Sequence, residues 1–294
     1  MPESLEATTG PALPRPVRDA RPARRLRDAF EPIAMHNIGS AAILARAGAP
    51  GLDFAAGYVW GRAAPMGELA AEVVVAAFGV FEPGLISAAY RRGREAVGRE
   101  ALLEAQAEVT AGTLRAVLGD IDVSPAVTAL RRGVEAADGT ARALFSGLRS
   151  LPWPTDPAAQ LWRACNLLRE HRGDSHLAAS ISAGLGPVAM NIVTELWLGM
   201  PLGPYTATRG WSEPQVAAAV RDLEQRGLVA AGALTAAGRQ LRDTIEERTD
   251  AMERPVVEAI GDDFESIVAQ LQEWSNLCIA AKTFTSDVYK RAAG

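Results

Sequence analysis

The chain has 294 residues, of which 48% are apolar, and its formal net charge is −5. This length suits one large domain or two ordinary ones, and the apolar fraction is enough for a sizeable core. The mildly acidic balance excludes a general attraction to nucleic acid or to anionic lipid.

The first 24 residues predict a disordered tail, because they combine proline, arginine and small residues without hydrophobic periodicity. They lack the apolar core of a signal peptide, and no later apolar run approaches the length of a membrane span. We therefore expect a cytoplasmic protein without membrane contacts. Cys165 and Cys278 each lie in a helical apolar pattern without a partner at metal-ligand spacing, which favours buried free thiols.

Residues 25–150 predict a helical domain, since alanine and leucine dominate and the alternation typical of strands is scarce. We expect this N-terminal domain to enclose an apolar pocket for a small molecule. The expected helices are 25–48 with a break near Pro32, then 52–60, 67–79, 83–96, 99–118 and 124–149.

A proline-rich link over residues 151–157 separates this domain from a second helical region, 151–294. The helix that follows is expected to end at residue 172, because Gly173 suits the position just past a helix end. Asp174 then suits the N-cap of a further helix over 175–185.

The segment from Gly210 to Gln215 reads as a turn followed by a capping box, in which Ser212 caps a helix over 213–226. A short strand, a four-residue turn, a return strand at Leu234 and a long helix from residue 236 complete the pattern. A last helix over 262–282 has an apolar face that fits a dimer contact or an interdomain contact.

These residues carry a family resemblance. W-S-E-P-Q-V-A-A-A-V-R-D-L-E-Q-R-G-L-V followed by L-T-A-A-G-R-Q-L-R resembles the second half of a MarR-type winged helix. From about residue 26 the chain is similar to an actinobacterial helix-turn-helix family, through G-R-A-A-P-M-G (61–67), L-P-W-P (151–154), L-L-R-E-H-R-G-D-S-H (167–176) and R-G-W-S (209–212). The resemblance implies an all-α fold with a multi-helix N-terminal domain, a MarR-like winged-helix unit at about 187–250 and C-terminal helices that form a homodimer. It implies no reaction.

The charge of the winged-helix segment disfavours DNA binding. Between residues 205 and 250 six arginines stand against seven acidic residues, and the turn between the strands is uncharged. Specific binding needs several phosphate contacts from arginine or lysine. A winged helix kept for packing or dimerisation is therefore an equally good interpretation.

The segment R-E-H-R-G-D-S-H (169–176) contains two of the three histidines in the chain. If His36 from the first helix packs against it, the imidazoles of His36, His171 and His176 converge with the Asp174 carboxylate. Three nitrogen or oxygen ligands with an open position are typical of a zinc or iron site. Without a metal, the same groups would act as general acid and base. The alternative is structural, with Asp174 as a helix cap.

The segment G-Y-V-W-G-R-A-A-P-M-G (57–67) is a second candidate. Arg62 among small and aromatic residues suits a guanidinium that binds a carboxylate or phosphate, and Arg172 is a further candidate. Tyr58 and Trp60 would form the wall of an apolar pocket. In the alternative, Arg62 only binds carbonyl groups at a helix end.

Two classes of function follow from the sequence. One is an enzyme of bacterial secondary metabolism that acts on a small molecule through these histidine, aspartate and arginine residues. The other is a ligand-responsive, MarR-like transcription regulator in which the same pocket is a sensor. The uncharged turn and the acidic balance favour the enzyme, whereas the family resemblance favours the regulator.

Overall fold

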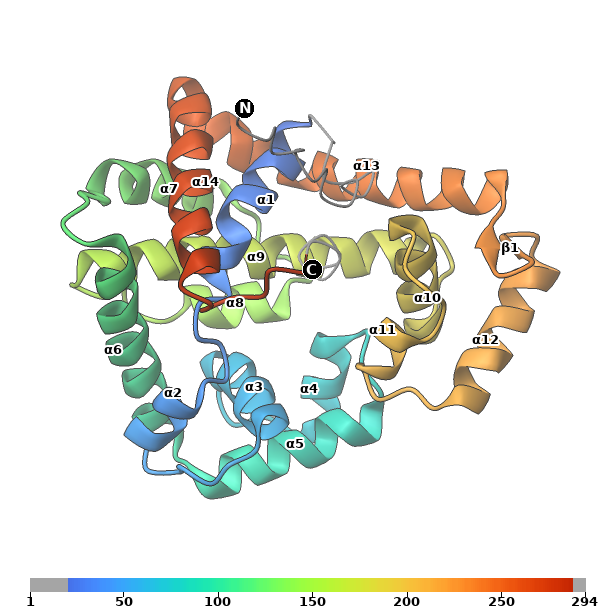
Figure 1. Ribbon diagram of the computed structural model, residues 1–294, viewed down its shortest axis with the longest axis horizontal. Coiled ribbons are helices and arrows are strands. Elements are labelled where there is room, and N and C mark those ends of the chain that lie inside the picture. The colour runs from blue at the N-terminus through green and yellow to red at the C-terminus, as the bar shows by residue number, and fades with distance from the viewer. Residues whose placement is uncertain (1–20, 288–294) are drawn as a thin grey trace, which may run out of the picture.

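Helices make up most of residues 21–287, the part of the chain that the computed structural model describes (Figure 1). The prediction of an all-α fold is confirmed. The sheet structure within the described residues consists of one two-stranded hairpin. The elements are α1 (Pro22–Ala34), α2 (Ala41–Arg46), α3 (Phe54–Ala63), the 3-10 helix η2 (Ala64–Met66), α4 (Ala71–Phe78), α5 (Pro83–Ala96), α6 (Arg99–Leu118), α7 (Ser124–Ala136), α8 (Ala143–Arg149), α9 (Pro157–Ser182), α10 (Pro187–Leu198), α11 (Pro204–Ala207), α12 (Glu213–Gln225), β1 (Val229–Ala230), β2 (Ala233–Leu234), α13 (Ala236–Ile260), the 3-10 helix η3 (Gly261–Asp263) and α14 (Phe264–Ala280).

The N-terminal elements differ from the prediction. Pro32 lies inside α1 and does not break it, whereas the chain leaves the helix after Ala34 and enters α2 at Ala41. Between them Asn37 and Gly39 have positive φ angles, which a continuous helix does not allow. Helix α1 begins at Pro22, so the last residues of the predicted tail are helical. The rest of that tail lies outside the described residues.

Helix α9 is a single helix of 26 residues, so the predicted end at Gly173 and the predicted cap at Asp174 are wrong. A glycine inside a helix costs about 1 kcal/mol, which tertiary contacts readily offset. Here the residues around Gly173 are held by ion pairs from three other helices. Glu170 pairs with Arg62 of α3, Arg172 pairs with Glu246 of α13, and Arg169 pairs with Glu31 of α1. His171 also contacts Glu253 of α13.

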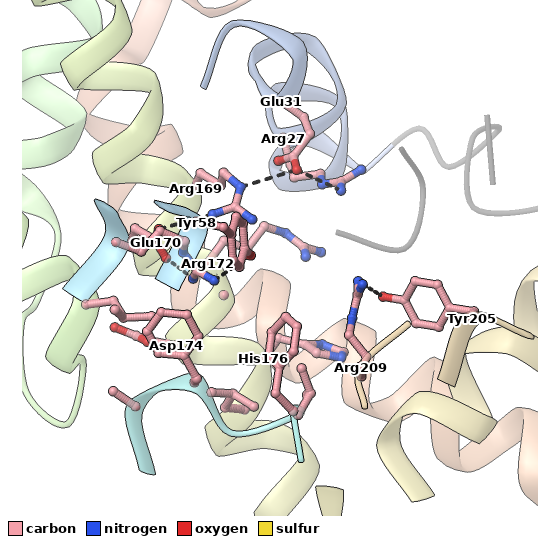
Figure 2. Close-up of a pocket in the computed structure, with 18 of the residues that line it drawn as sticks. Arg27, Glu31, Tyr58, Arg169, Glu170, Arg172, Asp174, His176, Tyr205 and Arg209 are labelled. Atoms are coloured by element: carbon pink, nitrogen blue, oxygen red, sulfur yellow. Dashed lines mark hydrogen bonds and ion pairs between the residues drawn. The ribbon is translucent and has the colours of Figure 1, made fainter. Parts of the chain in front are cut away.

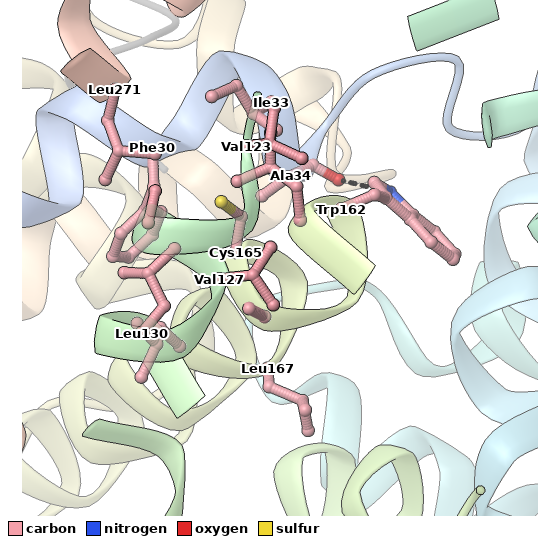
Figure 3. Packing of buried hydrophobic residues seen from close by; sticks show 14 of the residues in the cluster. Phe30, Ile33, Ala34, Val123, Val127, Leu130, Trp162, Cys165, Leu167 and Leu271 are labelled. Atoms are coloured by element: carbon pink, nitrogen blue, oxygen red, sulfur yellow. Dashed lines mark hydrogen bonds between the residues drawn. The ribbon is translucent and has the colours of Figure 1, made fainter. Parts of the chain in front are cut away.

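The main core surrounds the first half of α9 (Figure 3). Phe30 and Ile33 of α1 and Leu130 of α7 pack there, and the Trp162 Nε1–H donates to the carbonyl oxygen of Ala34 over 3.2 Å. The apolar face of α14 packs against α1, so of its two predicted roles the structure shows the contact within the chain. The prediction for the cysteines is confirmed, since Cys165 and Cys278 are buried and free.

The segment predicted as a winged helix, residues 187–250, lies at the far end of α9 from this core, and we use the name winged-helix unit for these residues (Figure 1). Its capping box is formed as predicted, with Ser212 and Gln215 at the start of α12. The wing pairs Val229 with Leu234 in antiparallel register. The Oγ1 of Thr235 accepts a hydrogen bond at the start of α13, and this long helix returns from the wing to the main core.

No single helix of residues 21–287 has the length and apolarity to cross a membrane. Consecutive helices α9 and α10 pass that test only when taken together, and they are bent by 105°.

Candidate functional site

A cavity of about 140 Å³ lies where the middle of α9 meets α1, α3, α4, α13 and the winged-helix unit (Figure 2). Arginine is the most frequent residue in its wall. The cavity is lined by Arg24, Arg27, Glu31, Tyr58, Arg62, Ala77, Phe78, Val80, Phe81, Leu144, Arg169, Glu170, Arg172, Gly173, Asp174, His176, Leu177, Tyr205, Arg209 and Arg242.

One wall is a buried arginine–carboxylate pair. The Arg62 Nε–H and Nη2–H donate to the two oxygens of Glu170 over 2.8 and 2.7 Å, and the Arg62 Nη1–H donates to the Tyr58 hydroxyl over 2.7 Å. Burial alone would lower the pKa of Arg62, but Glu170 and Tyr58 hold it above its usual value. Burial alone would raise the pKa of Tyr58, but Arg62, Arg169 and Arg209 together lower it.

A second wall comes from α1. The Arg169 Nε–H donates to the Glu31 carboxylate over 3.3 Å, and Arg27 lies 3.7 Å from the same carboxylate (Figure 2). Arg27 and Glu31 are each 3% exposed. Even so, the Nε and Nη2 of Arg27 and one oxygen of Glu31 have no hydrogen-bond partner among the described residues. Buried donors without partners are costly, and they are the groups that a ligand satisfies.

A third wall is an ion cluster around Glu246 of α13. Arg24, Arg172 and Arg242 all pair with this fully buried carboxylate. Burial alone would raise the pKa of Glu246, but the three guanidinium groups hold it well below its usual value. The cluster ties α1, α9 and α13 together at the edge of the cavity.

The fourth wall belongs to the winged-helix unit. The Arg209 Nη2–H donates to the Tyr205 hydroxyl over 2.7 Å, and the guanidinium stacks on the rings of Tyr205 and Phe81 at 4.3 and 5.1 Å. Figure 2 shows this pair on the opposite side of the cavity from Arg169 and Glu170. Arg209 is half-buried, and no carboxylate of residues 21–287 forms an ion pair with it.

We use the term cavity network for the charged lining residues together with their direct ion partners. Among the described residues the network has seven guanidinium groups and six carboxyl groups, which leaves a surplus of one positive charge when every carboxyl group is ionised and of two when Asp174 is protonated. Its members are Arg24, Arg27, Arg62, Arg169, Arg172, Arg209 and Arg242 with Asp28, Glu31, Glu170, Asp174, Glu246 and Asp250.

Asp174 does cap a helix, but not the predicted one. Its carboxylate accepts a hydrogen bond from the backbone N–H of Phe145 over 3.2 Å, in the first turn of α8, which has no cap of its own. Burial raises the pKa of Asp174 to about 7, and nearby Glu170 adds to the shift. A carboxyl group in a cavity with a pKa near neutrality is suited to acid–base chemistry.

The three histidines do not meet, which corrects the predicted convergence. His171 Nδ1 lies 2.9 Å from Glu253, and His176 Nδ1 lies 3.3 Å from Thr249, both on α13. His36 instead contacts Thr113 of α6 over 2.9 Å and lines a separate cavity of about 20 Å³. The predicted corner at Gly173 would have turned the rings together, and the continuous helix removes it.

No three His, Cys, Asp or Glu side chains of the described residues are placed to hold a metal ion. A zinc or iron site at His36, His171 and His176 stays a prediction, which their separate surroundings do not support. Burial lowers the pKa of His36 to about 4 and that of His176 to about 3, so both imidazoles are neutral at pH 7.

Of the residues predicted to bind a substrate, Tyr58, Arg62 and Arg172 line the cavity. Trp60 does not, because it lies two residues from Tyr58 and therefore on the opposite face of α3. It is fully buried in a different cluster, where its Nε1–H donates to the carbonyl oxygen of Val97.

Sequence reasoning missed the arginines of α1 and of the winged-helix unit. One signal was present, since Arg24, Arg27 and Glu31 recur at spacings of three and four and so share one helix face. No comparable signal marks Arg209, because its role depends on how the winged-helix unit meets the rest of the chain.

Residues 23–285 match the model of a family described as the helix-turn-helix family. The chain belongs to this family. No curated protein and no solved structure matches it. For this helix-turn-helix protein the family description therefore gives an architecture, and the chemistry must be argued from the cavity.

Proposed function

We propose that the protein is a ligand-responsive transcription regulator of the MarR-like type, in which the cavity binds a small anionic molecule and the winged-helix unit carries the response. The observation behind this proposal is the composition of the cavity wall. Tyr205, Arg209 and Arg242 of the winged-helix unit line a cavity whose remaining walls come mainly from α1, α3, α4 and α9. A ligand in the cavity would contact both parts at once.

The segment between α4 and α5 supplies a physical link between the cavity and the winged-helix unit. Val80 and Phe81 line the cavity. The carbonyl oxygen of Val80 accepts hydrogen bonds from the Asn191 side chain over 2.8 Å and from Trp211 Nε1–H over 2.9 Å. The carbonyl oxygen of Arg209 accepts one from the backbone of Glu82. Ligand contacts with this segment would therefore bias the position of α10 and α12.

The exposed surface of α12 limits how DNA would be bound. Arg221, Arg239 and Arg248 are exposed and form no ion pair with a carboxylate of residues 21–287, whereas Arg226 pairs with Asp222, and Arg209 and Arg242 are turned to the cavity. With three such arginines in each copy we expect a homodimer to make no more than about six arginine–phosphate contacts, so the slope of the salt dependence should be at most about −5.

The test is a mobility-shift assay on the DNA upstream of the protein's own gene, at about 50 mM and about 150 mM salt with unrelated competitor DNA. We expect a specific complex at low salt whose affinity changes when phenyl phosphate is added. Arg221→Glu should abolish the complex. Arg254→Glu, at an exposed position of α13 outside the winged-helix unit, should leave the complex intact. No specific complex at low salt would refute the regulator.

An enzyme acting on a small molecule is the second candidate, and one observation favours it. The cavity contains Tyr58, whose pKa is lowered, and Asp174, whose pKa is raised to about 7. A pure sensor does not need acid–base groups tuned towards neutral pH. The test is to incubate the protein with a cell extract and to follow metabolites by mass spectrometry. A metabolite consumed by the wild type, but not by Tyr58→Phe or Asp174→Asn, would support the enzyme.

A further inference from the structure

The charge balance of the cavity network restricts the ligand. Its positive surplus lies in a chain whose net charge is −5, so positive charge is concentrated at the cavity. A monocarboxylate would match the network with Asp174 ionised. A phosphate monoester carries about −1.5 to −2 at pH 7 and would match the network with Asp174 protonated, the state that a bound dianion favours.

The hydrogen-bond donors also suit a phosphoryl group. Among the described residues, the Nε and Nη2 of Arg27 and the Nε of Arg209 are buried donors without a hydrogen-bond partner. Arg27 lies beside Arg169 on one side of the cavity, and Arg209 lies on the other side (Figure 2). A phosphoryl group has three terminal oxygens that can accept from several directions, whereas a carboxylate has two oxygens in one plane.

The remainder of the wall is apolar and aromatic. Phe78 and Phe81 lie edge to face with ring centroids 6.0 Å apart, and Leu144 and Leu177 also line the cavity. Each water-sized group occupies about 10–15 Å³ of cavity volume. A cavity of about 140 Å³ therefore holds a ligand of roughly ten heavy atoms. This size suits a phosphoryl group with a short apolar body.

We propose that the cavity binds a small phosphate monoester, with its phosphoryl group among Arg27, Arg169 and Arg209 and its apolar body against Phe78 and Phe81. This inference rests on the proposed function, in which the cavity binds an anion. It adds the chemical class of that anion.

The test is titration calorimetry with four aromatic probes of similar size, using full-length protein in a phosphate-free buffer. Phenyl phosphate and phthalate carry two negative charges, benzoate carries one and phenol carries none at pH 7. We expect phenyl phosphate to bind at least about 10-fold more tightly than phthalate and benzoate, because charge-assisted bonds from arginine to phosphate are the strongest available here. Phenol should not bind measurably.

Arg209→Gln is the first variant, because removing this arginine leaves no buried carboxylate without a partner. It should weaken phenyl phosphate binding by about 10- to 100-fold, the range for one hydrogen bond to a charged group. Arg226→Gln, which removes an exposed arginine of the same unit, should leave binding unchanged. Gly173→Leu should block binding by volume alone, since a Cβ at Gly173 meets no atom within 4 Å and the side chain would enter the cavity.

Three results would overturn the inference. Phthalate or benzoate binding as tightly as phenyl phosphate would show an anion site without preference for phosphate, and the regulator proposal would stand. Equal weakening by Arg209→Gln and Arg226→Gln would place binding outside the cavity. Failure of folded wild-type protein to bind phenyl phosphate would exclude this ligand class, whereas the DNA assay would still test the regulator independently.

Discussion

Asp174 offers the sharpest test of the cavity. Its carboxyl group is 6% exposed, faces Glu170 as well as Arg62, and accepts one backbone hydrogen bond from Phe145. Replacing it by asparagine keeps an oxygen that accepts this hydrogen bond and removes the charge. We therefore expect Asp174→Asn to fold normally and to differ from the wild type in how its stability depends on pH.

The magnitude follows from the raised pKa. Burial moves the pKa of Asp174 from 3.8 to about 7. The folded protein thus binds a proton that the unfolded chain has lost between about pH 4 and pH 7, so this group makes stability fall as the pH rises through that window. At about 1.4 kcal/mol per pH unit, the ionised carboxylate destabilises the fold above pH 8 by up to about 4 kcal/mol.

The assay is urea unfolding of the wild type and Asp174→Asn at about pH 5 and about pH 8.5. The two proteins should be nearly equal at the lower pH. At the higher pH the variant should unfold at a midpoint about 1 M higher, given an m-value of about 3 kcal/mol/M. Asp120→Asn on the exposed loop after α6 serves as the control and should show no difference. An Asp174→Asn effect that is the same at both pH values would refute the reasoning.

Three further substitutions test the surroundings. Gly173→Ala should raise the free energy of unfolding by about 0.5–1 kcal/mol in urea titrations, since the added methyl meets no neighbour; a loss would show that the helix is strained there. Glu170→Gln leaves the Arg62 guanidinium buried without a carboxylate and should cost about 3 kcal/mol, with partial recovery in Arg62→Met/Glu170→Gln; additive losses in this double-mutant cycle would contradict the pairing. Glu253→Ala removes the buried partner of His171 and should lower stability by about 1–3 kcal/mol in thermal unfolding, and a loss below about 0.5 kcal/mol would mean that the bond contributes little.

The sequence determined much of the local structure. Helices α5 and α6 have the predicted bounds, and the capping box at Ser212, the hairpin and the start of α13 at Thr235 are where the pattern places them. These features depend on residues within one or two turns of each other, so their signals are complete in the sequence. The buried cysteines follow from apolar periodicity in the same way.

The tertiary structure alone decided the course of α9 and the composition of the cavity. Gly173 and Asp174 carry the local signals of a helix end, but ion pairs of Glu170 and Arg172 with distant helices keep the helix continuous. Arg62 and Glu170 are 108 residues apart, and Arg209 reaches the cavity only because the winged-helix unit packs there. Charge pairing in a buried site depends on which helices meet, and that information is not contained in any short stretch of the chain.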